Sequence, residues 1–190
     1  MILERILPYS KTLLKQAVEC GDVVIDGTAG NGHDTLFLAQ LVGDSGHVYS
    51  FDVQETAVEN TKQRLLEHGV NHVTVVHDGH QHVKKYMTPN HQSVSAAIFN
   101  LGYLPGSDHS ITTQGETTLT AIKEILTLLK VNGIIVLVVY HGHEQGKLEK
   151  SYLLEQLSQL DQKQVSVLEY RYLNQKGDAP FILALEKVKA

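Results

Sequence analysis

Short, mainly apolar runs alternate along the sequence with longer stretches whose apolar residues recur at a helical period. Five runs have the length of strands: residues 23–25, 47–51, 73–76, 94–99 and 134–139. The last two runs are nearly unbroken, as in strands that are covered on both faces, so we place them at the centre of the sheet. One helix is expected before the first run, at 9–18, and others between the runs, at 35–42, at 54–68 and after 113. This alternation predicts an α/β protein with a parallel sheet and helices on both faces.

Two helix boundaries carry local signals. Gly69 follows the helix expected at 54–68 and suits the C′ position, where the backbone turns left-handed. Thr113 and Glu116 have the spacing of a capping box, which predicts a helix that begins there. Four apolar residues would share one face of that helix: Leu119, Ile122, Leu126 and Leu129.

The last two strands distinguish between related architectures. Residues 165–173 and 181–186 read as strands, and only residues 174–180 connect them. A parallel pair needs a crossover of about a dozen residues or more, so this pair is expected to form an antiparallel hairpin. A mostly parallel seven-stranded sheet with an antiparallel last strand is the Rossmann-like fold of class I methyltransferases. A dehydrogenase-type domain would more often continue in parallel.

Composition bounds the remaining possibilities. With 190 residues, 42% of them hydrophobic, the chain can bury one core, and we expect a single domain spanning 1–190. The net charge of −5 argues against a broad nucleic-acid-binding surface, although a basic patch or a dimer groove would still suit a small RNA. Cys20 is the lone cysteine, and no stretch has the roughly 20 apolar residues of a membrane span. We therefore expect a cytoplasmic protein that does not enter a membrane.

A glycine-rich turn follows the first strand. It contains Gly27, Gly30 and Gly32, a spacing that does not match the Gly-x-Gly-x-x-Gly fingerprint of dinucleotide-binding folds. Asp26 precedes the turn, and its carboxylate would repel a pyrophosphate but would attract an ammonium group. The turn therefore points to the amino-acid end of S-adenosylmethionine.

Polar side chains stand at the ends of the first four strands, at Asp26, Asp52, Asp78 and Asn100. The carboxyl ends of parallel strands meet at one rim, so these side chains can share a pocket. Asp26 would hold the methionine part of the cofactor, Asp52 the ribose hydroxyls and Asp78 the adenine amino group. The Thr28 hydroxyl would either bind the ligand carboxylate or cap the following helix.

Several motifs together resemble the YtqB-like family, long labelled as rRNA methylases, and the resemblance covers nearly the whole chain. They are residues 26–34, residues 99–106, Tyr140-x-Gly142-His143-x-x-Gly146 and Asn174-Gln175. Members identified as MnmM resemble tRNA methyltransferases that convert 5-aminomethyl-2-thiouridine at the wobble position to its 5-methylaminomethyl form. The resemblance implies S-adenosyl-L-methionine as cofactor and the anticodon arm of tRNA as partner. The opening motif is also similar to that of the 16S rRNA cytosine-N4 methyltransferases, which carry an inserted domain that this chain has no room for.

Asn100 and Tyr103 have the spacing of the Asn-Pro-Pro-Tyr motif of amino-group methyltransferases, with both prolines replaced. In that motif a carbonyl orients the amine and the aromatic ring stacks on the target base, so both residues are predicted to be catalytic. The expected cofactor-binding residues are Asp26, Thr28, Gly30, Asn31, Gly32, His33, Asp34, Asp52, Gln54, Asp78, His80 and Asn100. The expected substrate-binding residues are Tyr103, Leu104, Pro105, Gly106, His143 and Asn174.

The chain holds eleven histidines, and the closest pairs are His80-x-His82 and His141-x-His143. No cysteine joins them and no His-Glu-x-x-His motif is present, so no metal site is expected. A methyltransferase for rRNA or for a small metabolite would share the cofactor residues, and a non-catalytic RNA-binding protein is a further alternative. A homodimer would give a small acidic protein more contact area for tRNA.

Overall fold

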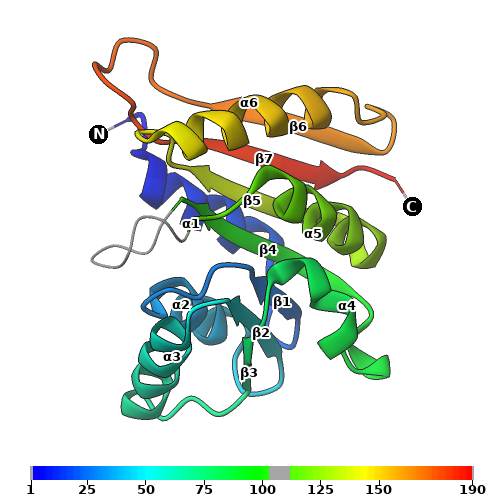
Figure 1. The fold of residues 1–190 in the computed structure, drawn as a ribbon. Helices are drawn as coiled ribbons and strands as arrows, with labels where there is room; N and C mark the ends of the chain where they lie inside the picture. Colours follow the sequence, from blue (N-terminus) through cyan, green and yellow to red (C-terminus); the bar gives the residue numbers. More distant parts are fainter. Residues whose placement is uncertain (1, 103–111, 190) are drawn as a thin grey trace.

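The computed structural model describes residues 2–102 and 112–189, and its seven strands form one sheet in the order β3-β2-β1-β4-β5-β7-β6 (Figure 1). The strands are β1 (Val23–Asp26), β2 (His47–Asp52), β3 (Val73–His77), β4 (Val94–Leu101), β5 (Leu129–Val139), β6 (Val165–Tyr170) and β7 (Phe181–Lys187). The helices are α1 (Ile6–Ala17), α2 (His33–Val42), α3 (Glu55–Glu67), α4 (Val83–Tyr86), α5 (Gly115–Leu128) and α6 (Glu144–Ser158). Two short 3₁₀ helices cover His80–His82 and Pro89–His91.

Strands β1 to β5 pair in parallel, whereas β7 is antiparallel to both β5 and β6. The expected fold and the antiparallel end of the sheet are confirmed. Strand β6 ends at Tyr170, three residues earlier than expected. Tyr170 pairs with Ile182, so in this register Tyr172 would face Pro180. Proline has no N–H to donate, and the ladder therefore stops before it.

Each face of the sheet has its own apolar core. Side chains of α4, α5 and α6 pack on one face, and those of α1 and α2 pack on the other. From Ala96 to Phe99 the side chains of β4 alternate between the two faces, because Ala97 and Phe99 join the first core while Ala96 and Ile98 join the second. All four are fully buried, as expected for a strand covered on both faces.

The end of α3 matches its expected signal. Gly69 has a φ of 66° and donates to the Leu66 carbonyl over 3.1 Å, and Val70 donates to the Leu65 carbonyl over 2.9 Å. These two bonds are those of a Schellman motif, in which a left-handed residue closes the helix.

The expected capping box is wrong. Helix α5 begins at Gly115 with Gln114 as its N-cap, and the Thr113 hydroxyl donates to Glu149 of α6 over 2.6 Å instead. Leu129 does not continue the helix, because β5 begins there without an intervening loop. Residues 130–133 then bulge from the ladder, with Asn132 at a φ of 64°, before regular pairing resumes at Ile134.

Helix α6 is not among the helices expected from the sequence, and it packs Leu153 and Leu157 into the first core. In the described part of the chain, no helix has both the length and the apolar character needed to cross a membrane.

Candidate active site

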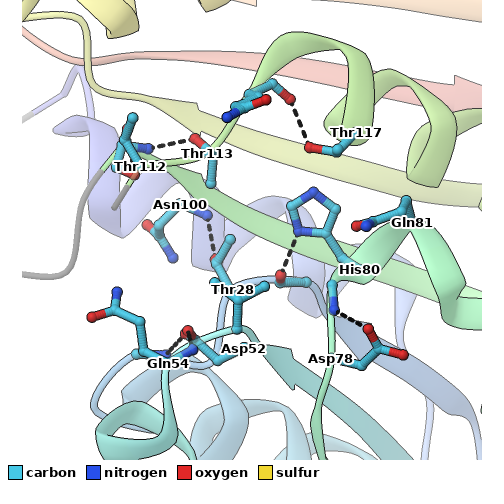
Figure 2. A pocket seen from close by; sticks show the side chains of 16 residues that line it. Thr28, Asp52, Gln54, Asp78, His80, Gln81, Asn100, Thr112, Thr113 and Thr117 are labelled. Atoms are coloured by element: carbon cyan, nitrogen blue, oxygen red, sulfur yellow. Dashed lines mark hydrogen bonds between the residues drawn. The ribbon is translucent and has the colours of Figure 1, made fainter. Parts of the chain in front are cut away.

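A cavity of about 460 Å³ opens at the carboxyl ends of β1 to β4 (Figure 2). Seven of its lining residues were expected to bind a cofactor: Thr28, Gly30, Asp52, Gln54, Asp78, His80 and Asn100. Nine were not: Gly27, Val53, Gly79, Gln81, Gly102, Thr112, Thr113, Gln114 and Thr117. The topology places the carboxyl ends of parallel strands at one edge, so residues distant in sequence meet there.

The glycines of the turn allow close packing. A Cβ on Gly27 would overlap the Phe99 ring, and a Cβ on Gly32 would lie 2.9 Å from the Thr61 Cα. Gly32 also has a φ of 76° as the N-cap of α2, a conformation that costs little without a Cβ. Gly30, with a φ of 54°, lines the cavity, but its N–H donates to Asp52. The conformation of the turn is therefore fixed by contacts within the protein, and Gly27 and Gly30 line the cavity without side chains.

Asp52 stands at the end of β2 and is held by two backbone donors. Its carboxylate accepts the Gly30 N–H over 2.9 Å and the Gln54 N–H over 3.0 Å. A carboxylate has about four acceptor positions, so the fixed group can still accept hydrogen bonds from hydroxyls in the cavity. Val53 beside it is 58% exposed, and this side chain adds an apolar contact surface between Asp52 and Gln54.

Asp26 does not line the cavity, contrary to expectation. Its side chain is fully buried, and it accepts the Thr28 N–H over 3.1 Å and the Thr35 hydroxyl over 2.6 Å. Burial raises the pKa of its carboxyl to about 7, and the negative charges of Asp34 and Asp52 add to the rise. A direct contact between Asp26 and a ligand does not fit this position. Asp26 instead stabilises the glycine-rich turn through its hydrogen bonds with Thr28 and Thr35.

Asp78 lines the cavity, but its carboxylate is bonded elsewhere. It accepts hydrogen bonds from the Tyr86 hydroxyl over 2.7 Å, the His82 ring over 2.9 Å and the Gly79 N–H over 2.8 Å. The Tyr86 and His82 bonds hold the pKa of this carboxyl well below its usual range. In Figure 2 the carboxylate points away from Thr28 and Asp52. The expected contact between Asp78 and an adenine amino group would compete with these bonds.

His80 forms part of the wall between the turn and α5. Its ring lies edge-on to Phe99 at 5.2 Å, and its Nδ1 lies 2.9 Å from the Gly27 carbonyl. A carbonyl only accepts, so Nδ1 carries the proton. Burial lowers the pKa of the imidazole and so favours its neutral form. Its hydrogen bond to the Gly27 carbonyl holds the turn in place.

Asn100 connects three of the expected residues. Its N–H donates to the Thr28 hydroxyl over 2.7 Å, as Figure 2 shows, and its side-chain NH₂ donates to Asp34 over 2.8 Å. The N-cap of α2 is Gly32, so Thr28 does not cap that helix. Asp34 is not a lining residue; its second oxygen lies 3.6 Å from the Lys11 ammonium.

Asn31 and His33 face α3 rather than the cavity. The Arg64 guanidinium donates to the Asn31 carbonyl over 2.6 Å and lies 3.3 Å from the His33 ring. Both residues line a shallow depression of about 270 Å³ between α2 and α3. Asn31, Gly32 and His33 therefore do not line the cavity, although they were expected to bind the cofactor.

The expected substrate residues are only partly described. Tyr103, Leu104, Pro105 and Gly106 lie outside the described residues. His143 lies near the cavity rim, with its Nε2 3.2 Å from the Thr112 hydroxyl. Asn174 is exposed in the connection between β6 and β7 and does not line the cavity.

The side chains at the start of α5 are not among the expected site residues, because the spacing of Thr113 and Glu116 predicts a helix cap. Thr113 accepts the Gly102 N–H over 2.9 Å while donating to Glu149. This contact joins the end of β4 to α5 and α6 beside the cavity. Three hydroxyl-bearing residues within six positions, at 112, 113 and 117, were the available signal.

The charge of the cavity limits what it can bind. Among the described residues that line it, Asp52 and Asp78 carry carboxylates and no lysine or arginine is present. Such a wall favours a cationic ligand with hydroxyl groups and disfavours a pyrophosphate. The described residues contain no group of three or more histidine, cysteine, aspartate or glutamate side chains placed to hold a metal ion.

Residues 48–186 match a protein family described as "Putative rRNA methylase". The chain is 40% identical over 145 residues to a protein of Arabidopsis thaliana named tRNA (mnm(5)s(2)U34)-methyltransferase, chloroplastic, and the match covers 71% of this chain and 52% of that protein. The chain therefore spans about half the length of this curated relative.

Two solved bacterial structures are similar over nearly their full length. A Clostridium thermocellum protein with the same description as the family has a TM-score of 0.94 and 42% identity, covering 97% of this chain and 98% of that one. A Streptococcus mutans protein in complex with SAH has a TM-score of 0.88 and 41% identity, covering 97% of this chain and 99% of that one.

Proposed function

Because this chain belongs to the rRNA methylase family that its residues 48–186 match, we propose that it methylates the aminomethyl nitrogen of 5-aminomethyl-2-thiouridine at the tRNA wobble position. The cofactor is S-adenosylmethionine, which supplies a methyl group already activated on a positively charged sulfur. The protein therefore has to bind that cation, place the amine in line with the methyl group and keep competing water out.

The charge of the cavity wall supports the cofactor assignment most directly. Asp52 is fixed by two backbone donors, and the described lining residues contain no cation that would repel a sulfonium or an ammonium group. The fixed carboxylate suits a pair of ribose hydroxyls, and the exposed Val53 side chain suits an adenine face. The similar Streptococcus mutans protein is known in complex with SAH, the product of methyl transfer.

Asn100 supports an amine as the methyl acceptor. Its side-chain NH₂ is bonded to Asp34, which leaves an oxygen to accept a hydrogen bond from an N–H group of the substrate. Such a bond would orient the nitrogen lone pair without a strong base, provided the amine arrives unprotonated.

The substrate assignment draws on the Arabidopsis relative, whose name specifies the wobble uridine of tRNA. We propose that the anticodon arm approaches the rim formed by Gly102, Thr112 and His143, close to Asn100. We also propose that the protein acts in the cytoplasm as a homodimer, because a second copy would extend the RNA contact area of a chain with a net charge of −5.

Transfer of labelled methyl groups from S-adenosylmethionine to defined RNAs tests the proposal. An anticodon arm that carries 5-aminomethyl-2-thiouridine is expected to be labelled, and the same arm with unmodified uridine is not, because it lacks the amine. Equal labelling of both arms would refute the amine assignment. Labelling of 16S rRNA alone would indicate an rRNA methyltransferase instead. Mass spectrometry of wobble nucleosides from cells lacking the protein provides the matching test in vivo.

A further inference from the structure

The hydrogen bond between Asn100 and Asp34 fixes how the Asn100 amide is turned. The Asn100 Nδ2 lies 2.8 Å from the Asp34 Oδ2. An ionised carboxylate only accepts hydrogen bonds, so the NH₂ group must face Asp34. The amide oxygen is then the atom turned away from Asp34, on a residue that lines the cavity.

The rest of Asn100 is also held in place. Its backbone N–H donates to the Thr28 hydroxyl over 2.7 Å, and the residue pairs with Val138 in the central strands of the sheet. No hydrogen bond from the described residues reaches its side-chain oxygen. Asn100 therefore presents one fixed acceptor at the cavity wall.

Asp34 is itself anchored from two sides. It lies in the first turn of α2, where the helix dipole favours a carboxylate, and its Oδ1 lies 3.6 Å from the Lys11 ammonium of α1. The pKa of the Tyr140 hydroxyl is raised by the burial of Tyr140 and, in addition, by the negative charge of Asp34. Asp34 is a held, charged group that touches Asn100 but does not line the cavity.

We propose that Asp34 is a positioning residue for methyl transfer, which holds the Asn100 side-chain oxygen toward the amine substrate. This inference rests on the proposed function, and it replaces the expected direct role of Asp34 in cofactor binding. An amine that donates an N–H to a fixed oxygen has a defined lone-pair direction. If the Asn100 amide turned over, its NH₂ group would face the amine, and the orienting bond would be lost.

A reciprocal exchange of the two side chains tests the role. In Asp34→Asn, residue 34 can present either its oxygen or its NH₂ group, so the Asn100 orientation is no longer enforced. In Asn100→Asp, two carboxylates face each other and repel. The double variant Asp34→Asn/Asn100→Asp restores one donor and one acceptor between the two side chains, so that an acceptor oxygen of residue 100 is again held toward the cavity.

The expected result is coupling between the two positions in methyl transfer. Each single variant should lower the single-turnover rate on the aminomethyl anticodon arm by about ten- to a hundredfold, the range expected for a misplaced nucleophile. The double variant should recover at least about tenfold of the rate lost in Asn100→Asp. The Kd for SAH, measured by calorimetry, should stay within about twofold of the wild type in Asp34→Asn, because Asp34 is not a cavity residue. Asp44→Asn, which removes an exposed carboxylate, is the matched control.

Three outcomes would overturn the inference. If the fold-decrease in rate of the double variant equals the product of the fold-decreases in the two single variants, the residues act independently. A loss of SAH affinity in Asp34→Asn that matches its loss of rate would make Asp34 a cofactor residue. Rate losses that disappear when corrected for the folded fraction, from melting curves, would make the contact merely structural. An inactive wild type would refute the proposed function as well, whereas an active wild type with additive effects refutes only the role of Asp34.

Discussion

Replacing Asp26 by asparagine should change how the stability of the protein depends on pH. Asp26 is fully buried and accepts one hydrogen bond from the Thr28 N–H and one from the Thr35 hydroxyl. An asparagine of the same shape keeps an oxygen for the first bond and offers an N–H to the second. Thr35 can accept it, because its hydroxyl also lies 2.8 Å from the Ser50 hydroxyl and can donate there.

The size of the effect follows from the pKa of the Asp26 carboxyl, which rises from 3.8 in the unfolded chain to about 7 in the folded protein. At about 1.36 kcal/mol per pKa unit, this rise corresponds to about 4 kcal/mol, and complete burial leaves little solvent to screen it. A raised pKa means that the folded state binds the proton more tightly. Its contribution to stability is therefore fully present below about pH 4 and is lost as the pH rises through about 7.

Denaturant unfolding of the wild type and Asp26→Asn across this range checks the reasoning. The free energy of unfolding of the wild type, relative to that of the variant, should fall by about 3 kcal/mol between about pH 5 and pH 8. Glu59→Gln, an exposed change on α3, should leave the wild-type pH profile unaltered. A difference between the wild type and Asp26→Asn that stays constant over this range would refute the buried, proton-binding state of Asp26.

Three further substitutions test separate contacts. Asp52→Ala should weaken SAH binding by about 1.5 to 3 kcal/mol through loss of charge-assisted hydrogen bonds, and unchanged calorimetric affinity would exclude Asp52 from the cofactor site. Glu149→Leu should lower the free energy of unfolding by about 2 to 4 kcal/mol, because the Thr113 and Thr118 hydroxyls lose their acceptor. Glu149→Gln keeps an acceptor oxygen and should lower the free energy of unfolding clearly less; equal decreases in the two variants would argue against these bonds. Gly27→Ala should lower the melting temperature, because its Cβ would overlap the buried Phe99 ring and such overpacking lowers the free energy of unfolding by about 1 to 3 kcal/mol. A melting curve identical to that of the wild type would contradict this packing.

Much of the fold was predictable from the sequence because its signals are local. Unbroken apolar runs marked the central strands, and the short connection at 174–180 required an antiparallel pair. The same logic placed Asp52, Asp78 and Asn100 at one edge of the sheet, where the cavity opens.

Side-chain direction was not predictable, because it depends on distant partners. Asp26 and Asp52 both end strands, but Asp26 turns inward to Thr35 while Asp52 is held at the cavity by backbone donors. Asp78 is engaged by Tyr86, a residue of a four-residue helix that is too short to show a period. A strand-end carboxylate therefore indicates where a site lies, but not which atoms face it.

The contribution of α5 was hidden for a related reason. Thr113 and Glu116 have the spacing of a cap, yet the Thr113 hydroxyl donates to the carboxyl group of Glu149, 36 residues later in the chain. Local propensity and tertiary contact competed for one hydroxyl, and the tertiary contact prevailed.

The position of β7 has a consequence for biosynthesis. It follows β6 in the chain, yet it lies between β5 and β6, and within residues 2–102 and 112–189 it is the only strand paired with β6. While the chain is being synthesised, β6 emerges without a partner and β5 keeps an open, apolar edge until β7 arrives. All seven strands belong to one sheet, and domains generally fold as units, so the sheet is not complete until β7 has been made. The waiting edge of β5 is then the part of the nascent protein most exposed to pairing with another chain, and chaperone protection should be needed there.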